Sequence, residues 1–282
     1  MNSVLTSIIY LIISSLLIIL SKYTFDKVSQ YKIEEQIKEN NFSPVIGFIG
    51  YITGIIIILI GAYAGPSAAR FRIDLLMFVL YSLVGILLMN LSNIITDKCL
   101  LYKFSTKKEI IEDKNVGTAA VHFGIYMATG LIISACVNGE YGGILSSIVY
   151  YVLGMVFLFL FFKIYDIITP YSIHEELEKD NYAVGIALAG NIIAIGLILM
   201  KATLGDIADI QQNIILYFID LSSIILLLPS LRFILGNVLI KSININTEIK
   251  NNNIAAGLIE FVTIIGFTLL IFFMVDFSAL VM

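Results

Sequence analysis

Residues 173–190 read IHEELEKDNYAVGIALAG, an acidic segment that leads through Asn181 into a run of small apolar residues. Charged residues with an apolar residue at each turn are typical of a short helix lying at a membrane surface. Asparagine is a favoured helix N-cap, so Asn181 is expected to begin a membrane-spanning helix. The alanines and glycines that follow would let this helix approach its neighbours closely.

The same pattern occurs three more times along the chain. An apolar residue stands four positions before each central asparagine, and a glutamate stands six positions before three of them. The other copies are IEEQIKENNFSPVIGFIG (33–50, on Asn41), KKEIIEDKNVGTAAVHFG (107–124, on Asn115) and INTEIKNNNIAAGLIEFV (245–262, on Asn253). A repeat at this spacing predicts four copies of one structural unit.

The composition places these copies in a lipid bilayer. Of the 282 residues, 59% are hydrophobic and 13% are charged, and the mean hydropathy is +0.96. A soluble domain carries about 25% charged residues. The few charges of this chain could not cover this much apolar surface in water. The sequence has no basic stripe of the kind that binds nucleic acid.

Apolar runs long enough to cross a bilayer as helices occur eight times. The expected spans are 4–21, 44–64, 75–96, 116–137, 143–162, 182–200, 210–231 and 254–280. The first is expected to be retained, because neither a preceding basic residue nor a cleavage site marks it as a signal peptide. The connecting segments alternate between long and short, which places all the long ones on one side of the membrane.

Basic residues predict which side that is. The chain has 17 lysines and arginines, and all but Arg70, Arg72 and Lys201 lie in the long segments. Cytoplasmic loops carry such an excess, so the long loops are predicted to be cytoplasmic and both termini to lie outside.

The predicted fold is therefore an all-α integral membrane protein with eight transmembrane helices. They would form four parallel helical hairpins (1–70, 71–140, 141–208 and 209–282), grouped into two tandem four-helix units, 1–140 and 141–282. The even-numbered spans, rich in small residues, are expected to pack inside, and the bulkier odd-numbered spans to face lipid.

One part of the sequence resembles a known family. The stretch from Tyr165 through Asp166 to Pro170, followed by Glu175 and Asn181, is similar to the bacterial membrane family called domain of unknown function 350. The resemblance implies a bacterial inner-membrane protein with two tandem copies of a four-span unit, and it implies no particular activity. Asp26 stands at the same offset from Asn41 as Asp166 from Asn181, whereas Leu100 and Val238 replace it in the other copies.

Ionisable residues inside spans are costly and are candidates for function. His122, Asp220 and Glu260 fall within predicted spans, and His122 and Glu260 both lie seven residues after their asparagine. If the two units pack about a pseudo-two-fold axis, both side chains could approach it and form a proton or cation relay. The alternative is that each group only hydrogen-bonds a neighbour and fixes helix packing.

Two functions remain open on this evidence. The first is a channel or carrier coupled to protons or small ions, and the alternative is a non-transporting scaffold or envelope-stress partner that recruits a cytoplasmic protein through its long loops. Homo-oligomerisation is a further hypothesis. The sequence carries no catalytic, phosphate-binding or zinc motif, so no enzyme activity, cofactor or metal site is predicted.

Overall fold

The computed structural model describes residues 3–65, 67–68, 70–99, 107–138, 143–204, 217–219, 222, 230 and 234–275, and every regular element in these residues is a helix. The long helices are α1 (Ser3–Ser29), α3 (Phe42–Ala64), α4 (Phe71–Cys99), α5 (Val116–Val137), α6 (Gly143–Ile168), α8 (Tyr182–Thr203) and α11 (Ile254–Met274). The short ones are α2 (Ile33–Lys38), η1 (Lys108–Glu112), α7 (Ile173–Glu178), η2 (Leu235–Leu239) and α10 (Ile245–Lys250).

All seven long helices are long and apolar enough to cross a membrane. They correspond to seven of the eight expected spans, and the remaining one, 210–231, lies mostly outside the described residues. Two helices extend well past the expected ends at the long-loop side. α1 continues to Ser29, and a salt bridge of 2.8 Å between Lys22 and Asp26, one turn apart, supports the helix beyond the apolar run.

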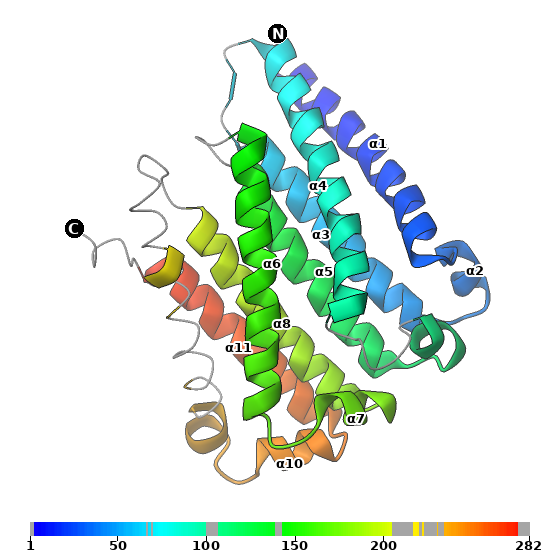
Figure 1. Ribbon diagram of the computed structural model, residues 1–282, viewed down its shortest axis with the longest axis vertical. Coiled ribbons are helices and arrows are strands. Elements are labelled where there is room, and N and C mark those ends of the chain that lie inside the picture. The colour runs from blue at the N-terminus through cyan, green and yellow to red at the C-terminus, as the bar shows by residue number, and fades with distance from the viewer. Residues whose placement is uncertain are drawn as a thin grey trace.

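The long helices form two layers (Figure 1). α3, α5, α8 and α11 pack side by side in a row, α4 lies across α3 and α5, and α6 lies across α5 and α8. Within the apolar window of each helix, 89% of residues are buried in α5 and 83% in α8, against 17% in α1. The expected inner position of the small-residue helices is therefore confirmed for α5 and α8. It is not confirmed for α3 and α11 at the two ends of the row, because α3 (44%) is no more buried than α4 (44%) and α11 (28%) is less buried than α6 (33%).

Neighbouring helices of the row meet in one repeated register. The ninth residue after the asparagine in one copy lies against the backbone of the eighth residue after the asparagine in the next copy. A methyl group on Gly50, Gly124 or Gly190 would lie 2.6–2.7 Å from the Cα of Phe123, Ala189 or Phe261, respectively. Such contacts require glycine and bring the helix backbones together, which is how helices associate without a hydrophobic driving force in lipid.

The repeated asparagine begins each inner helix, as expected. Asn115, Asn181 and Asn253 accept a hydrogen bond through Oδ1 from a backbone N–H two or three residues later, at 2.7–3.1 Å. Asn41 occupies the same position before α3 but makes no such bond. The residue three positions later is Pro44, which has no N–H to donate.

The Nδ2 group of the same asparagine joins one copy to the next. It donates to a backbone carbonyl of the following copy in three cases. These bonds are Asn41 to Ile111 O (3.2 Å), Asn115 to Leu177 O (2.6 Å) and Asn181 to Ile249 O (3.2 Å). Because each acceptor is the apolar residue four positions before the next asparagine, the bonds place successive copies in the same register and direction.

The residue immediately before each asparagine has a left-handed backbone. The φ angles are 53° at Asn40, 55° at Lys114 and Asp180, and 60° at Asn252. Asparagine and aspartate tolerate this conformation, which suits three of the four positions but not Lys114. Two of these short side chains also reach the preceding copy. Asp180 accepts from the Gly117 N–H at 3.0 Å, and Asn252 accepts from the Ala183 N–H at 3.2 Å.

The packing predicts opposite effects for two Gly→Ala substitutions. A methyl group at Gly185 would clash with the Gly117 carbonyl of α5, whereas at Gly266 it would meet nothing within 4 Å. Gly185→Ala should lower the free energy of unfolding by about 1–3 kcal/mol. Gly266→Ala should leave it unchanged or raise it by up to about 1 kcal/mol through helix propensity. Reversible unfolding in mixed micelles, followed by circular dichroism, measures both; equal effects would contradict the repeated register.

Candidate functional site

Glu260 lies on α11 with its side chain completely buried. Its Oε1 accepts hydrogen bonds from the Tyr165 hydroxyl of α6 at 3.2 Å and from Asn191 Nδ2 of α8 at 3.0 Å. Asn191 also donates to the Tyr165 hydroxyl oxygen at 3.3 Å and to the Ala187 carbonyl of its own helix at 2.9 Å. Three helices thus bring their polar side chains to one carboxyl group, which stabilises it away from water.

His122 lies on α5 and is equally enclosed. Its Nε2 is 3.7 Å from Oδ1 of Asp97, which stands near the long-loop end of α4. The side chain of His122 is 4% exposed, whereas that of Asp97 is 39% exposed. Asp97 therefore lies at the surface on the long-loop side, and His122 lies next to it in the buried interior of the first unit.

Further polar side chains continue from His122 deeper into the first unit. Tyr126, whose ring centroid is 6.0 Å from that of His122, donates its hydroxyl to Asn93 Oδ1 at 2.8 Å. The Tyr51 ring meets the Tyr126 ring at 5.6 Å, and its hydroxyl donates to the Ser21 carbonyl at 3.1 Å. The polar groups of α1, α3, α4 and α5 are thus arranged in one buried cluster.

The clusters occupy corresponding positions in the two halves of the chain. His122 and Glu260 both stand seven residues after their asparagine, and Tyr51 and Asn191 both stand ten residues after theirs. The junction between the second and third copies places the buried apolar side chains of Ile125 and Leu188 at these positions. Polar clusters therefore alternate with an apolar junction along the row.

The expected approach of His122 and Glu260 to each other is wrong. The two residues lie on α5 and α11, and α8 packs between these helices (Figure 1). The pseudo-two-fold arrangement fails because each copy contacts the next through the same register, which produces a row. Each ionisable residue instead belongs to the cluster of its own half.

The structure describes most of the other predicted site residues. Asp26 accepts from the Ile33 N–H at 3.2 Å, and so joins the end of α1 to the start of α2. Asp166 is half-buried near the end of α6, and Pro170 is exposed in the turn that follows. Asp220 lies outside the described residues.

Of the two neighbouring glutamates in the family-like stretch, Glu175 is exposed and Glu176 makes the structural contact. Glu176 Oε2 accepts from Asn181 Nδ2 at 3.1 Å. The equivalent acceptors are Gln36, Glu109 and Glu248, at 2.8–2.9 Å from Asn41, Asn115 and Asn253. Glu109 stands six residues before its asparagine and the others stand five, because η1 is a π-helix and holds one more residue per turn.

The local environment raises the pKa of one of these interfacial acids, Glu109, and lowers the pKa of another, Glu176. Burial raises the pKa of Glu109, although the hydrogen bond from Asn115 acts against it. Burial also acts to raise the pKa of Glu176, but hydrogen bonds from Lys179 and Asn181 outweigh it, and the pKa is lowered overall. Glu176 is held as a carboxylate by Lys179 Nζ, 2.9 Å from its Oε1.

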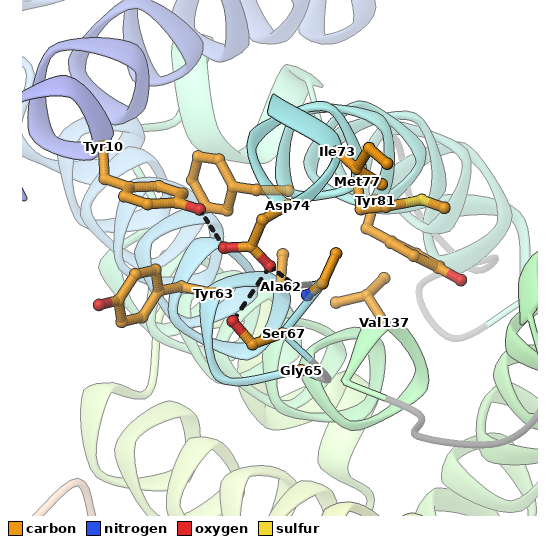
Figure 2. Close-up of a pocket in the computed structure, with 12 residues that line it drawn as sticks. Tyr10, Ala62, Tyr63, Gly65, Ser67, Ile73, Asp74, Met77, Tyr81 and Val137 are labelled. Carbon is orange, nitrogen blue, oxygen red and sulfur yellow. Dashed lines mark hydrogen bonds between the residues drawn. The ribbon is translucent and has the colours of Figure 1, made fainter. Parts of the chain in front are cut away.

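A cavity of about 290 Å³ opens at the short-loop end of the first unit, between α1, α3, α4 and α5 (Figure 2). Asp74 projects into it and accepts hydrogen bonds from the Tyr10 hydroxyl at 2.6 Å, the Ala68 N–H at 2.8 Å and the Ser67 hydroxyl at 3.2 Å. These three bonds hold the start of α4 to α1 and to the preceding loop. The described residues include no group of three or more metal-ligating side chains, here or elsewhere.

Sequence reasoning missed Tyr165, Asn191 and Asp97 as members of the clusters. Asn191 could have been predicted from the sequence, because an uncharged amide in the middle of an apolar span needs a hydrogen-bond partner inside the bundle. Asp97 stands at the end of an apolar run, where a charged residue is ordinary, so only the packing of α4 on α5 shows its proximity to His122.

The helical layers and the buried clusters define a polytopic α-helical membrane protein made of two similar units in tandem. The chain belongs to the family described as Domain of Unknown Function (DUF350), whose model matches residues 1–137 and again residues 140–275. The two tandem copies expected from the resemblance are thereby confirmed.

Two relatives agree with this assignment. The chain is 27% identical over 261 residues to a UPF0719 transmembrane protein of Aquifex aeolicus (strain VF5), covering 88% of this chain and 92% of that protein. It is 27% identical over 122 residues to the UPF0719 transmembrane protein YshE of Bacillus subtilis (strain 168), covering 43% of this chain and 87% of that protein. YshE therefore corresponds to about one of the two units. No solved structure matches the chain.

The Glu260 cluster predicts different tolerance to two substitutions. Glu260→Leu removes the buried carboxyl group that accepts hydrogen bonds from Tyr165 and Asn191, which should destabilise the protein by about 1–3 kcal/mol. Glu260→Gln keeps an amide oxygen in the same place and should cost less. Thermal unfolding in detergent measures the difference, with Glu248→Gln at the interface as the control. Equal stability of the Leu and Gln variants would show that these hydrogen bonds contribute nothing.

Proposed function

We propose that the protein conducts or transports protons, or a small cation coupled to them, across the bacterial plasma membrane. The observation that carries the proposal is the complete burial of Glu260 in a span, held by a tyrosine hydroxyl and an amide. A buried carboxyl group is expensive in a membrane and marks ion or proton pathways by default. Glu260 can take up and release a proton while Tyr165 and Asn191 hold its carboxyl group in place.

The first unit supports the same proposal with different chemistry. Asp97 is exposed to the long-loop side, and His122 lies next to it in the interior. Imidazole can both accept and donate a proton, which suits a group that passes protons between a surface carboxylate and a buried cluster. Two units with a proton-binding residue at the same position give the protein two such sites.

The topology that goes with this function has eight spans, with 210–231 as the seventh, and places the long loops in the cytoplasm. The excess of lysine and arginine in the long loops supports this orientation. Asp97 and His122 would then form a cytoplasmic entrance, and Asp74 would face the outside.

The scaffold alternative receives less support. Two acids of the long-loop side, Glu109 and Glu176, are buried and accept hydrogen bonds from Asn115 and Asn181, so they are not available to a partner. Their role is to hold the interfacial helices to the inner row. The other acids of the long loops in the described residues are at least partly exposed, so the scaffold stays the second candidate.

Flux in proteoliposomes tests the proposal. Vesicles that contain a pH-sensitive dye should acidify faster with the wild-type protein than without it, under an inward proton gradient with and without Na⁺ or K⁺. Glu260→Gln and His122→Gln should each reduce this rate, because glutamine cannot exchange a proton.

The matched control is Glu248→Gln, which makes the same change outside the membrane spans and should retain the wild-type rate. All variants are first compared by size-exclusion chromatography and thermal unfolding, so that loss of flux is not loss of fold. Wild-type rates in both Glu260→Gln and His122→Gln, or a wild-type rate equal to that of empty vesicles, would reject the proposal.

Cysteine labelling tests the topology. In a background of Cys99→Ser and Cys136→Ala, Ser67→Cys should react with a membrane-impermeant maleimide in intact cells. Ser172→Cys and Asn244→Cys should react only after permeabilisation, because both lie on the long-loop side. Labelling of Asn244→Cys in intact cells would show that 210–231 does not span the membrane.

A further inference from the structure

Among the described residues, nothing covers the edge of the helix row on α11. The repeat contains a small residue thirteen positions after each asparagine: Gly54, Ala128, Ala194 and Gly266. Inside the chain, the first two lie against the backbone of the next copy. Methyl groups on Gly130 and Gly196 would lie 2.6 Å from the Cα atoms of Gly54 and Ala128.

Gly266 has the same position in the fourth copy. No heavy atom of the described residues would come within 4 Å of a methyl group there. Ala255, which corresponds to Gly117 and Ala183 in the register, is exposed as well. Glycine inside a helix costs about 1 kcal/mol relative to alanine, and nothing in the described part of the chain requires it at Gly266.

The opposite edge of the row, on α3, is also left uncovered by the part of the chain that the structure describes. The residues that would meet a preceding copy stand four, eight and fifteen positions after Asn41, and they are Val45, Ile49 and Ile56. Ile49 is 50% exposed and Ile56 is 40% exposed. In the register used inside the chain, the residue fifteen positions after one asparagine packs beside the residue thirteen positions after the preceding asparagine. Ile56 of a second copy would therefore fill the space beside Gly266.

One relative has the length of a single unit. In the present protein, the second and third copies form the junction between the two units, where Gly124 meets Ala189. YshE matches 43% of this chain over 87% of its own length, which is about one unit. In a one-unit protein the same junction could form only between two molecules.

We propose that the row continues between molecules, with the α11 edge of one protomer packed against the α3 edge of a second copy in the register used inside the chain. The contact is head to tail, so it joins two different surfaces and can extend to further copies or close into a ring. Val262 and Ile49 replace the small residues of the junction between the units, so the helices stand further apart and associate more weakly than within the chain.

Disulfide crosslinking in native membranes tests the register. In the Cys99→Ser, Cys136→Ala background, the double variant Gly266→Cys with Ile56→Cys should give dimers and a ladder of higher multimers on mild oxidation. Co-expression of the two single variants should give dimers only, because each chain then carries one reactive edge. Each single variant expressed alone should remain monomeric.

The control pairs Gly266→Cys with Leu83→Cys, a half-exposed residue of α4 at a similar depth but away from both edges. A Gly266→Cys variant that crosslinks to itself would show that α11 pairs with α11, and this would overturn the head-to-tail contact. Crosslinking of Gly266→Cys with Ile56→Cys no faster than with Leu83→Cys would show that lipid covers the edge, and this would also overturn it.

Discussion

The hydrogen bond from the amide of one asparagine to a backbone carbonyl of the next hairpin determines how this protein is built. The first backbone N–H groups of a membrane helix lack an acceptor within the helix and have little water to bind. Each repeat places an asparagine at that point. Its Oδ1 satisfies the helix start in three copies, and its Nδ2 reaches the next copy in the first three. One side chain therefore sets both where an inner helix begins and how far it stands from its neighbour.

That register also determines where polar groups can meet. Because each inner helix is shifted in the same way relative to the next, both His122 and Glu260, seven positions after their asparagines, lie beside the inner helix of the preceding copy. The polar groups at these sites are Tyr165, Asn191 and Glu260 in the second half of the chain, and Tyr51 and His122 in the first. At the junction between the two units, the corresponding positions are the apolar residues Ile125 and Leu188. The two units therefore contain two separate polar clusters.

Much of the fold could be predicted from the sequence because its constraints are local. The length of apolar runs indicates the spans, asparagine indicates the helix starts, and small residues indicate the inner helices. The mutual arrangement of the copies is not local, and so the pairing of His122 with Glu260 was wrong. Matching seven-residue offsets show equal depth, but equal depth is compatible with a row as well as with a two-fold axis.

The candidate site was predicted in part for the same reason. Glu260 and His122 are recognisable because charge inside a span is rare, whereas Asp97 and Tyr165 depend on which outer helix crosses which inner one. The offset of Glu109 needed the structure as well, since an additional residue in a π-helical turn cannot be distinguished from an insertion in a loop.

The direction of the asparagine bonds has a consequence for how the chain acquires its structure during synthesis. Asn41, Asn115 and Asn181 each donate forward, to a carbonyl that has not yet been made when the asparagine enters the membrane. Every completed hairpin therefore presents an unfinished binding surface to the hairpin that the ribosome delivers next. The native contacts can then form in chain order between neighbours in sequence, without a search among distant segments.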